Sequence, residues 1–432
     1  MSRRASSPLA SRKRPGARLP RRNALLGGTT TRHDVATALR CLALPASLAD
    51  GTAVETLETS FAASTGAGHA VSFAAGRVGL YGILRCLGIG AGDEVLVPVP
   101  THIVVANAVR YTGAQPVYVD CDLSSYNIDV AQAQERLTPR TRALLVQHTF
   151  GVPADVEQAR DLALRNGLYL IEDCVHALGA AIGNGQVGTF GHAAFFSTEE
   201  TKTISTTMGG IVTTGDAELA RRLRDFQRSC RAPSADQAAR CLLKLVVYYL
   251  LTEPHTHVLA RAAYEASGRH HPLPRPTEAL ELRGLRPADF TRQLSNGQAA
   301  VGLTQLAALD ANLAHRRRIA DRYQALLAPH GFRLPEPLPG SVPAFVRYPV
   351  WTADRAAMRQ QTARRVILGT WFTSVLEEAV DPAYGGYPAG SCPRAEAAAR
   401  HLVNLPTHAR VSEDDADQIA ALVIAAERAG RR

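Results

Sequence analysis

Lysine is scarce in this chain, so the few lysines it keeps are candidates for chemistry. Among 48 basic residues only Lys13, Lys202 and Lys244 are lysines. Lys202 follows closely on a β-rich run in AAFFSTEETKTISTTMGGIVTT, beside hydroxyl side chains and glycines. Arginine keeps its proton in proteins, whereas lysine can lose it and then form a Schiff base with an aldehyde. Lys202 is therefore the predicted nucleophile, with an incidental surface lysine as the alternative.

A carboxylate upstream of Lys202 is suited to work with it. Asp173 ends a hydrophobic run in LYLIEDCVHALGA, which predicts a strand with the carboxylate at its end. Enzymes that use pyridoxal phosphate (PLP) need a carboxylate beside the pyridine nitrogen, because it keeps that nitrogen protonated. The neighbouring Glu172 should point to the opposite side of the strand, since side chains alternate. Lys202 and Asp173 together predict a PLP site; capping of the following helix is the alternative role for Asp173.

A site for the phosphate would complete this set. Residues 73–77, FAAGR, stand between a predicted strand and a helix pattern that starts near Val78. Small side chains there leave backbone N–H groups and a helix N-terminus open to an anion. Gly76 and Arg77 are the candidate phosphate ligands in this turn, and Ser197 is a candidate hydroxyl from another strand end.

The elements that must position these residues alternate regularly from about residue 69. The β-rich runs are HAVSF, DEVLVP, PVYVD, ALLVQ, LYLIED, AAFFS and GGIVTT. The helical patterns span Val78 to Leu87, Ala106 to Tyr111, Val130 to Arg136, Asp155 to Arg165 and Asp216 to Gln227. This order predicts an α/β fold with a mostly parallel central sheet and helices on both faces. Ligands of such sheets bind beyond the carboxyl ends of the strands.

We expect four segments. Residues 1–33 form a basic tail, 34–230 a PLP-binding large domain, 231–290 a helical insert or lid, and 291–432 a smaller C-terminal α/β domain. This last domain is predicted to contain a long helix, a strand in PAFVRYPVWT and a capped closing helix after Ser412. The tail holds nine basic and no acidic residues, whereas the remaining chain holds 39 of each sign. Its composition predicts disorder; a targeting peptide or nucleic-acid arm is the alternative.

The insert carries an apolar stretch, CLLKLVVYYLL, that is shorter than the ~20 residues needed to span a bilayer. We expect a helix packed on the core or on a partner subunit, with a membrane-surface contact as the alternative. Without a spanning segment or a signal-peptide core, we expect a cytoplasmic protein and no stable membrane insertion.

Neither a metal site nor a disulfide framework is predicted. The seven cysteines form no C-x-x-C pair and lie in apolar segments, as free thiols in a reducing compartment do. The insert contains four histidines that lack a carboxylate or cysteine partner at ligand spacing, namely His255, His257, His270 and His271.

With these residues placed, the chain resembles the DegT/StrS-type PLP aminotransferases, most of which act on nucleotide-linked keto sugars. The resemblance runs from about Val54 to the C-terminus and is interrupted by the insert. It rests on GIGAGDEVLVPVPTHIVVANAV, GAQPVYVDCDLSSYNID, HTFGVPAD, IEDCVHALGA, GTFGHAAFFS, TKTIS, MGGIVTT and QAAVGLTQLAALD. It implies the fold-type-I architecture, with PLP as cofactor.

The resemblance also implies roles for single residues. Lys202 is similar to the Schiff-base lysine and Asp173 to the pyridinium partner, while Ser197, Gly76 and Arg77 are similar to the phosphate binders. Ala75-Gly76-Arg77 replaces the commoner Ser-Gly-Thr, which changes how phosphate is held.

Three further residues are assigned in the same way. His176 occupies the place of a Gln or His near the cofactor's ring oxygen. His102 falls where many members stack an aromatic ring on PLP; an ordinary loop histidine is its alternative. Thr291 stands near where a partner subunit often offers Asn to the phosphate, and Thr206-Thr207 replaces a glycine-rich stretch.

The activity implied is transfer of an amino group from an amino acid such as glutamate to a keto sugar. The resemblance also implies a homodimer, with the Gln298 to Leu309 helix at its interface. A PLP-dependent sugar dehydratase on the same fold is the nearest alternative, but those enzymes replace the lysine with His. A non-catalytic regulator or nucleic-acid binder is a third; no recognition helix or aromatic platform is apparent, so no nucleic-acid partner is expected.

Overall fold

The structure is a computed structural model that describes residues 23–24, 28–254, 257 and 277–430. Its central feature is a seven-stranded sheet with the order β1-β10-β9-β6-β5-β2-β4. The strands are β1 (His69–Phe73), β2 (Glu94–Pro98), β4 (Gln115–Val119), β5 (Thr141–Gln147), β6 (Tyr169–Asp173), β9 (Ala193–Ser197) and β10 (Gly210–Thr214). All pairs are parallel except those of β10, which is antiparallel to β1 and β9. Each predicted β-rich run forms one of these strands, so the predicted mostly parallel sheet is confirmed.

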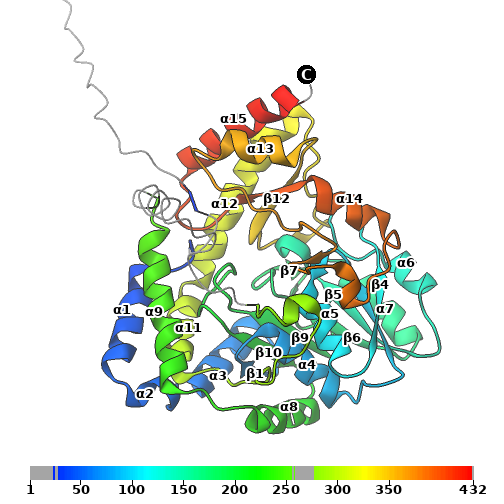
Figure 1. Cartoon of the computed structure of the whole chain (residues 1–432), viewed down its shortest axis with the longest axis vertical. Helices are drawn as coiled ribbons and strands as arrows, with labels where there is room; N and C mark the ends of the chain where they lie inside the picture. Colours follow the sequence, from blue (N-terminus) through cyan, green and yellow to red (C-terminus); the bar gives the residue numbers. More distant parts are fainter. Residues whose placement is uncertain (1–22, 25–27, 255–256, 258–276, 431–432) are drawn as a thin grey trace, which may run out of the picture.

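Helices cover both faces of this sheet, because its strands bury apolar side chains on both sides (Figure 1). One face packs against α4 (Gly76–Cys86), α5 (Ile103–Arg110) and α8 (Ala217–Ser229). The other packs against α3 (Ala53–Thr65), α6 (Val130–Glu135) and α7 (Val156–Arg165). Aspartates cap α6, α7 and α8, each accepting a backbone N–H of the first turn, and so fix where these helices begin.

A further layer is built from α1 (Arg32–Ala43), α2 (Ala46–Ala49), α9 (Ala235–Leu251) and α11 (Asn296–Ala307). In Figure 1, α9 stands beside α1 with its long axis along the edge of the molecule. The predicted helix in the insert is thus present and packs on its own chain through Leu242 and Leu245. No helix in the described part of the chain is long and apolar enough to cross a membrane.

The folded part of the chain begins earlier than the predicted boundary at residue 33. Asn23 is fully buried and forms a β-bridge with Val366, and Thr29 donates its hydroxyl to the carbonyl of Lys202 at 3.0 Å. Assigning all of residues 1–33 to a disordered tail was therefore wrong for these positions. Residues 1–22 and 25–27 lie outside the described residues, as do His255, His270 and His271.

The smaller domain begins with α12 (Leu309–Leu327). The predicted single helix from Asn296 is divided at Ala308, because α11 packs on α3 and α12 packs on the small-domain core. That core also contains β12 (Arg347–Trp351), α13 (Arg355–Thr362), β14 (Leu402–Pro406) and α15 (Glu413–Gly430), with α14 (Pro393–His401) alongside. Ser412 exchanges hydrogen bonds with Asp415 at the start of α15, as predicted.

Short elements complete the chain. They are β3 (Thr101–His102), β7 (Ala181–Ile182), β8 (Gly185–Gln186), β11 (Ser341–Val342), β13 (Leu376–Glu377), and the 3-10 turns η1 (Thr149–Gly151), η2 (Glu281–Arg283), η3 (Ala328–His330) and η4 (Pro382–Gly385). The parallel pairing of β13 with β3 places Glu377 opposite His102 and so brings a late segment to the ends of the central strands. All seven cysteines are free thiols, as predicted.

Candidate active site

A cavity of about 480 Å³ lies at the carboxyl ends of the central strands, where the sheet order predicts a ligand site. Its lining includes all of the predicted site residues except Thr291, namely Gly76, Arg77, His102, Asp173, His176, Ser197 and Lys202. A larger groove of about 1010 Å³ runs between α3 and α8, but none of the predicted site residues lines it. The chemistry predicted from the sequence therefore converges on the smaller cavity.

Lys202 lies in the loop after β9 with 9% of its surface exposed. Burial lowers the pKa of its amine to about 8, although the carboxylate of Glu199 acts in the opposite direction. Its Nζ lies 4.3 Å from the centroid of the Trp371 ring. A substantial fraction of this amine is therefore neutral near pH 8, which is the form that attacks an aldehyde.

Asp173 ends β6 and is fully buried at the floor of the cavity. One carboxylate oxygen accepts the N–H of Val175 at 3.1 Å, whereas Oδ2 has no hydrogen-bond partner among the described residues. Burial raises the pKa of this carboxyl to about 7. A buried acceptor without a donor is energetically costly, so the site fits a ligand that brings a protonated nitrogen to Oδ2.

The turn between β1 and α4 is shaped as an anion cradle. Ala75 caps α4 without a side-chain hydrogen bond, so the first helical amides are left for a ligand. A Cβ at Gly76 would lie 3.1 Å from the carbonyl oxygen of Phe196, and a Cβ at Gly210 would lie 2.3 Å from the amide nitrogen of Gly76. Glycine at both positions lets the cradle approach Ser197 closely, and these residues fit a phosphate group.

Arg77 contributes less free charge to this cradle than its position predicted. Its Nε lies 2.7 Å from a carboxylate oxygen of Glu281 in η2, and Glu281 is fully buried. The ion pair compensates the guanidinium charge, so the helix amides and Ser197 carry more of the predicted phosphate binding.

The two predicted histidines lie in different environments. His176 is buried and stacks on Trp371 with ring centroids 4.5 Å apart. Burial holds its pKa well below the usual value, and its Nδ1 accepts the N–H of Phe150, so the ring is neutral with the proton on Nε2. His102 is half-buried; its Nδ1 caps α5 and its Nε2 lies 3.3 Å from Glu378. His176 can thus donate a hydrogen bond to a ligand oxygen.

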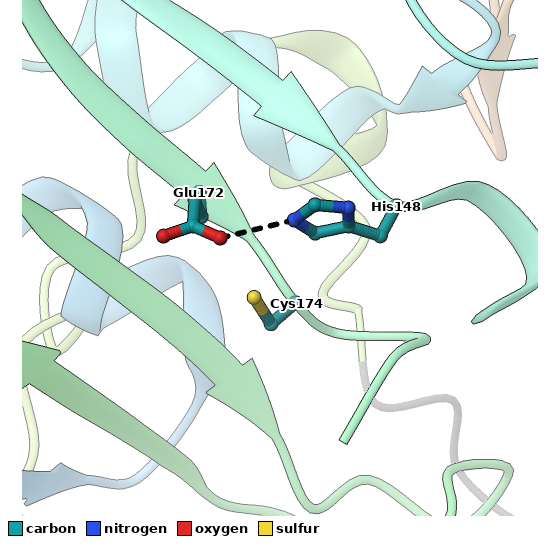
Figure 2. A group of neighbouring side chains, drawn as sticks. All are labelled: His148, Glu172 and Cys174. Atoms are coloured by element: carbon teal, nitrogen blue, oxygen red, sulfur yellow. Dashed lines mark hydrogen bonds and ion pairs between the residues drawn. The ribbon is translucent and has the colours of Figure 1, made fainter. Parts of the chain in front are cut away.

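Glu172 points away from the cavity, as predicted from strand alternation. Figure 2 shows it with His148 and Cys174, whose ligand atoms lie within 4.8 Å of one another. Glu172 accepts three backbone N–H groups of residues 188–191 and contacts Nε2 of His148 at 3.2 Å, while Nδ1 of His148 accepts the N–H of Ala154. Both imidazole nitrogens are therefore engaged. The group is a buried hydrogen-bonded network that fixes the end of β6, and the ligand atoms of His148 and Glu172 are already engaged within it.

Comparison with known proteins decides the family. A family model described as the DegT/DnrJ/EryC1/StrS aminotransferase family matches residues 31–424. The chain belongs to this family. It is similar to the GDP-perosamine synthase of Caulobacter vibrioides, with 31% identity over 372 residues that cover 84% of this chain and 87% of that protein.

Other relatives are similar over most of their length. The dTDP-3-amino-3,4,6-trideoxy-alpha-D-glucose transaminase of Streptomyces venezuelae is 33% identical over 360 residues, which cover 82% of each protein. Among solved structures, S. venezuelae DesV has 31% identity and a TM-score of 0.70, covering 93% of this chain and 95% of that chain. These findings confirm the predicted family, fold class, aminotransferase activity and PLP cofactor.

Several residues lining the aminotransferase cavity were not predicted from the sequence. Arg347, Trp371, Glu377 and Glu378 come from the small domain, and Tyr248 comes from α9 of the insert. One signal was present: Arg347 is a charged residue inside the apolar run PAFVRYPVWT, where a cation needs a function or a partner.

Lys244 was a second residue that the sequence could have singled out near this cavity, because this aminotransferase keeps so few lysines. Its Nζ lies 2.7 Å from Glu200, two residues before Lys202, and the hydroxyl of Tyr248 donates to the same carboxylate at 3.0 Å. Burial raises the pKa of Glu200 to about 7. This contact ties α9 to the loop that carries Lys202.

Replacement of Lys244 by methionine is expected to lower the free energy of unfolding by about 2–4 kcal/mol at pH 8, because it leaves a nearly buried carboxylate without its cation. The loss should shrink at pH 5.5, where Glu200 in the variant takes up a proton and no longer buries a charge. Denaturant unfolding at both pH values measures this, with Lys244→Arg as the charge-preserving control. A loss of equal size at both pH values would contradict the role of the Glu200 charge.

The lowered pKa of Lys202 also predicts how the cofactor-free aminotransferase takes up PLP. Only the neutral amine reacts, so the uptake rate should rise about fivefold from pH 7 to pH 8 and level off above pH 9, for a pKa of about 8. An ordinary lysine would instead gain about tenfold per pH unit up to pH 10. Stopped-flow absorbance of the bound cofactor distinguishes the two profiles.

Proposed function

We propose that this aminotransferase moves an amino group from an amino acid, such as glutamate, to the carbonyl carbon of a nucleotide-linked keto sugar. Relatives that the chain matches over most of their length include proteins named GDP-perosamine synthase and dTDP-3-amino-3,4,6-trideoxy-alpha-D-glucose transaminase. The observation that carries the proposal is that Lys202 and the unpartnered Oδ2 of Asp173 line one buried cavity.

When bound, PLP supplies an electron sink for the pair of electrons released at the donor's α-carbon. Asp173, whose Oδ2 has no partner among the described residues, would hold the pyridine nitrogen in its protonated form. Lys202, with its lowered pKa, is suited to take the proton from the donor's α-carbon as a neutral amine. It would then deliver this proton to the cofactor carbon that carries the transferred amino group. His176 donates its Nε2–H to an oxygen of the ligand, and the apolar faces of Trp371 and Phe195 help to exclude water.

The activity is tested by two half-reactions. The visible absorption of the purified holoenzyme should disappear on addition of the amino donor alone, and should return when a nucleotide-linked keto sugar is added, with an amino sugar detected by mass spectrometry. The matched control is Lys202→Ala. A product lacking a hydroxyl and containing no new nitrogen would support the dehydratase alternative and contradict the proposal.

We also infer a homodimer working in the cytoplasm. Most residues of α11 predicted for the interface are covered by α1, α3 and α9 of the same chain, so the inferred interface uses other surfaces. Thr291 does not line the cavity of its own chain, and its predicted phosphate contact therefore needs a partner's site. Light scattering on the holoenzyme tests the dimer, and a monomer that retains full activity would refute it.

A further inference from the structure

Arg347 is a buried cation without a direct partner among the described residues: burial lowers its pKa to about 9, and the carboxylates of Glu199 and Glu377 offset this only in part. Its side chain rises from β12 into the cavity with 4% of the residue's surface exposed, and it makes no hydrogen bond or ion pair with any described residue. Its guanidinium carbon lies 3.4 Å from the centroid of Trp371. An unpaired buried charge is strongly unfavourable, so the site is suited to an anionic ligand.

The surroundings hold this guanidinium in one place. A Cβ at Gly369 would lie 2.9 Å from Oδ1 of Asn404 and 3.1 Å from Nη1 of Arg347, so glycine leaves room for both side chains. The backbone of Trp371 is fixed on both sides by the amide side chain of Asn404, at 2.9 and 2.8 Å. A planar cation held on an aromatic face keeps its N–H edge free for two parallel hydrogen bonds to a carboxylate.

The place of Arg347 relative to Lys202 identifies the ligand. Nζ of Lys202 and the guanidinium carbon of Arg347 lie 4.3 and 3.4 Å from the centroid of the same indole ring, so the two cations are close neighbours. An amino donor must bring its amine to the aldehyde carbon of the cofactor, to which the amine of Lys202 would otherwise be bonded. In an α-amino acid the carboxylate is attached to the carbon that bears this amine, so it must lie within a few ångströms of Lys202.

We propose that Arg347, held by Trp371, binds the α-carboxylate of the amino donor and so selects α-amino acids over simple amines. This inference rests on the proposed aminotransferase function. The cofactor's phosphate is a different anion with its own cradle at Gly76 and Ser197, in the large domain. The diphosphate of a nucleotide sugar is the competing ligand, and it belongs to the second half-reaction.

The test compares two amines in single-turnover half-reactions of the holoenzyme, followed by absorbance. One is the amino acid that reacts fastest with the wild type, and the other is the amine that lacks its α-carboxylate. In Arg347→Met the concentration for half-maximal rate should rise about 10- to 100-fold for the amino acid, as expected for loss of a charged hydrogen-bonded pair. It should stay unchanged for the amine. Arg347→Lys should fall between, because it keeps the charge and loses the bidentate geometry.

A second readout does not depend on turnover. The α-methyl derivative of the same amino acid has no α-proton to lose, and its equilibrium binding, followed by the holoenzyme spectrum, should weaken by the same factor in Arg347→Met. Equal losses for the amino acid and the amine would assign Arg347 a structural role and overturn the inference. If Arg347→Met weakened the binding of the nucleotide sugar alone, the inference would also be overturned, and Arg347 would be assigned to the diphosphate. A wild type that accepts an amino group from no amino acid would instead refute the proposed function.

Discussion

Replacement of Lys202 by alanine should lower the single-turnover rate of amino transfer by at least about 10⁴-fold, the upper range for loss of a positioned acid–base group. Lys202 is the sole lysine among the described residues that line the cavity. The other lysine nearby, Lys244, is paired with Glu200 and cannot replace it. Rapid-mixing absorbance of the holoenzyme with the amino donor measures the rate.

Lys202→Arg is the matched control for the charge. Arginine keeps a cation beside Asp173 but cannot be deprotonated near neutral pH, so it should be as inactive as alanine. Circular dichroism and the elution volume of both variants should match the wild type, because the loop is held elsewhere by the hydroxyl of Thr29 and the amide of Asn312. An arginine variant with more than about a tenth of wild-type activity would show that the amine is not the proton carrier.

The site residues that could be identified from the sequence are those whose position follows from the neighbouring sequence alone. Lys202 and Asp173 each follow an apolar run that could only be a buried strand, and parallel strands bring their carboxyl ends together at one edge of a sheet. The strands themselves were recognisable because they are buried on both faces and contain continuous apolar residues. This is why the large domain, and the meeting of Lys202 and Asp173 at one cavity, were predictable.

What the sequence did not reveal depends on contacts between distant segments. Arg347 and Trp371 enter the cavity because the small domain folds back over the strand ends, and the pairing of β13 with β3 fixes that approach. The early start of the folded chain is similar: Thr29 is ordered by its contacts with Lys202 and Arg316, and neither contact leaves a periodic pattern in residues 23–31. Local propensity does not report such long-range packing.

Asp173→Asn is expected to reduce the rate of amino transfer by about 10²–10³-fold, the usual effect of removing one preorganised electrostatic group. The amide preserves the size of the side chain but cannot hold the positive charge of a protonated pyridine nitrogen against Oδ2. Asp173→Glu keeps the charge and misplaces it, so it should lose activity while still favouring the protonated nitrogen in the absorption spectrum. An asparagine variant with wild-type rates would contradict the assigned role of Asp173.

The substitution Asp173→Asn also tests how this carboxyl affects stability when no cofactor is bound. In the cofactor-free protein the pKa of Asp173 is about 7, above its usual 3.8, so the folded chain holds a proton that the unfolded chain releases. Asp173 therefore makes its full contribution to the free energy of unfolding below about pH 4. This contribution, up to about 4 kcal/mol, is lost as the pH rises to 7. Denaturant unfolding should show that Asp173→Asn removes this decline. Bound PLP should also remove it from the wild type, because the pyridine nitrogen then supplies the proton that the buried carboxylate needs.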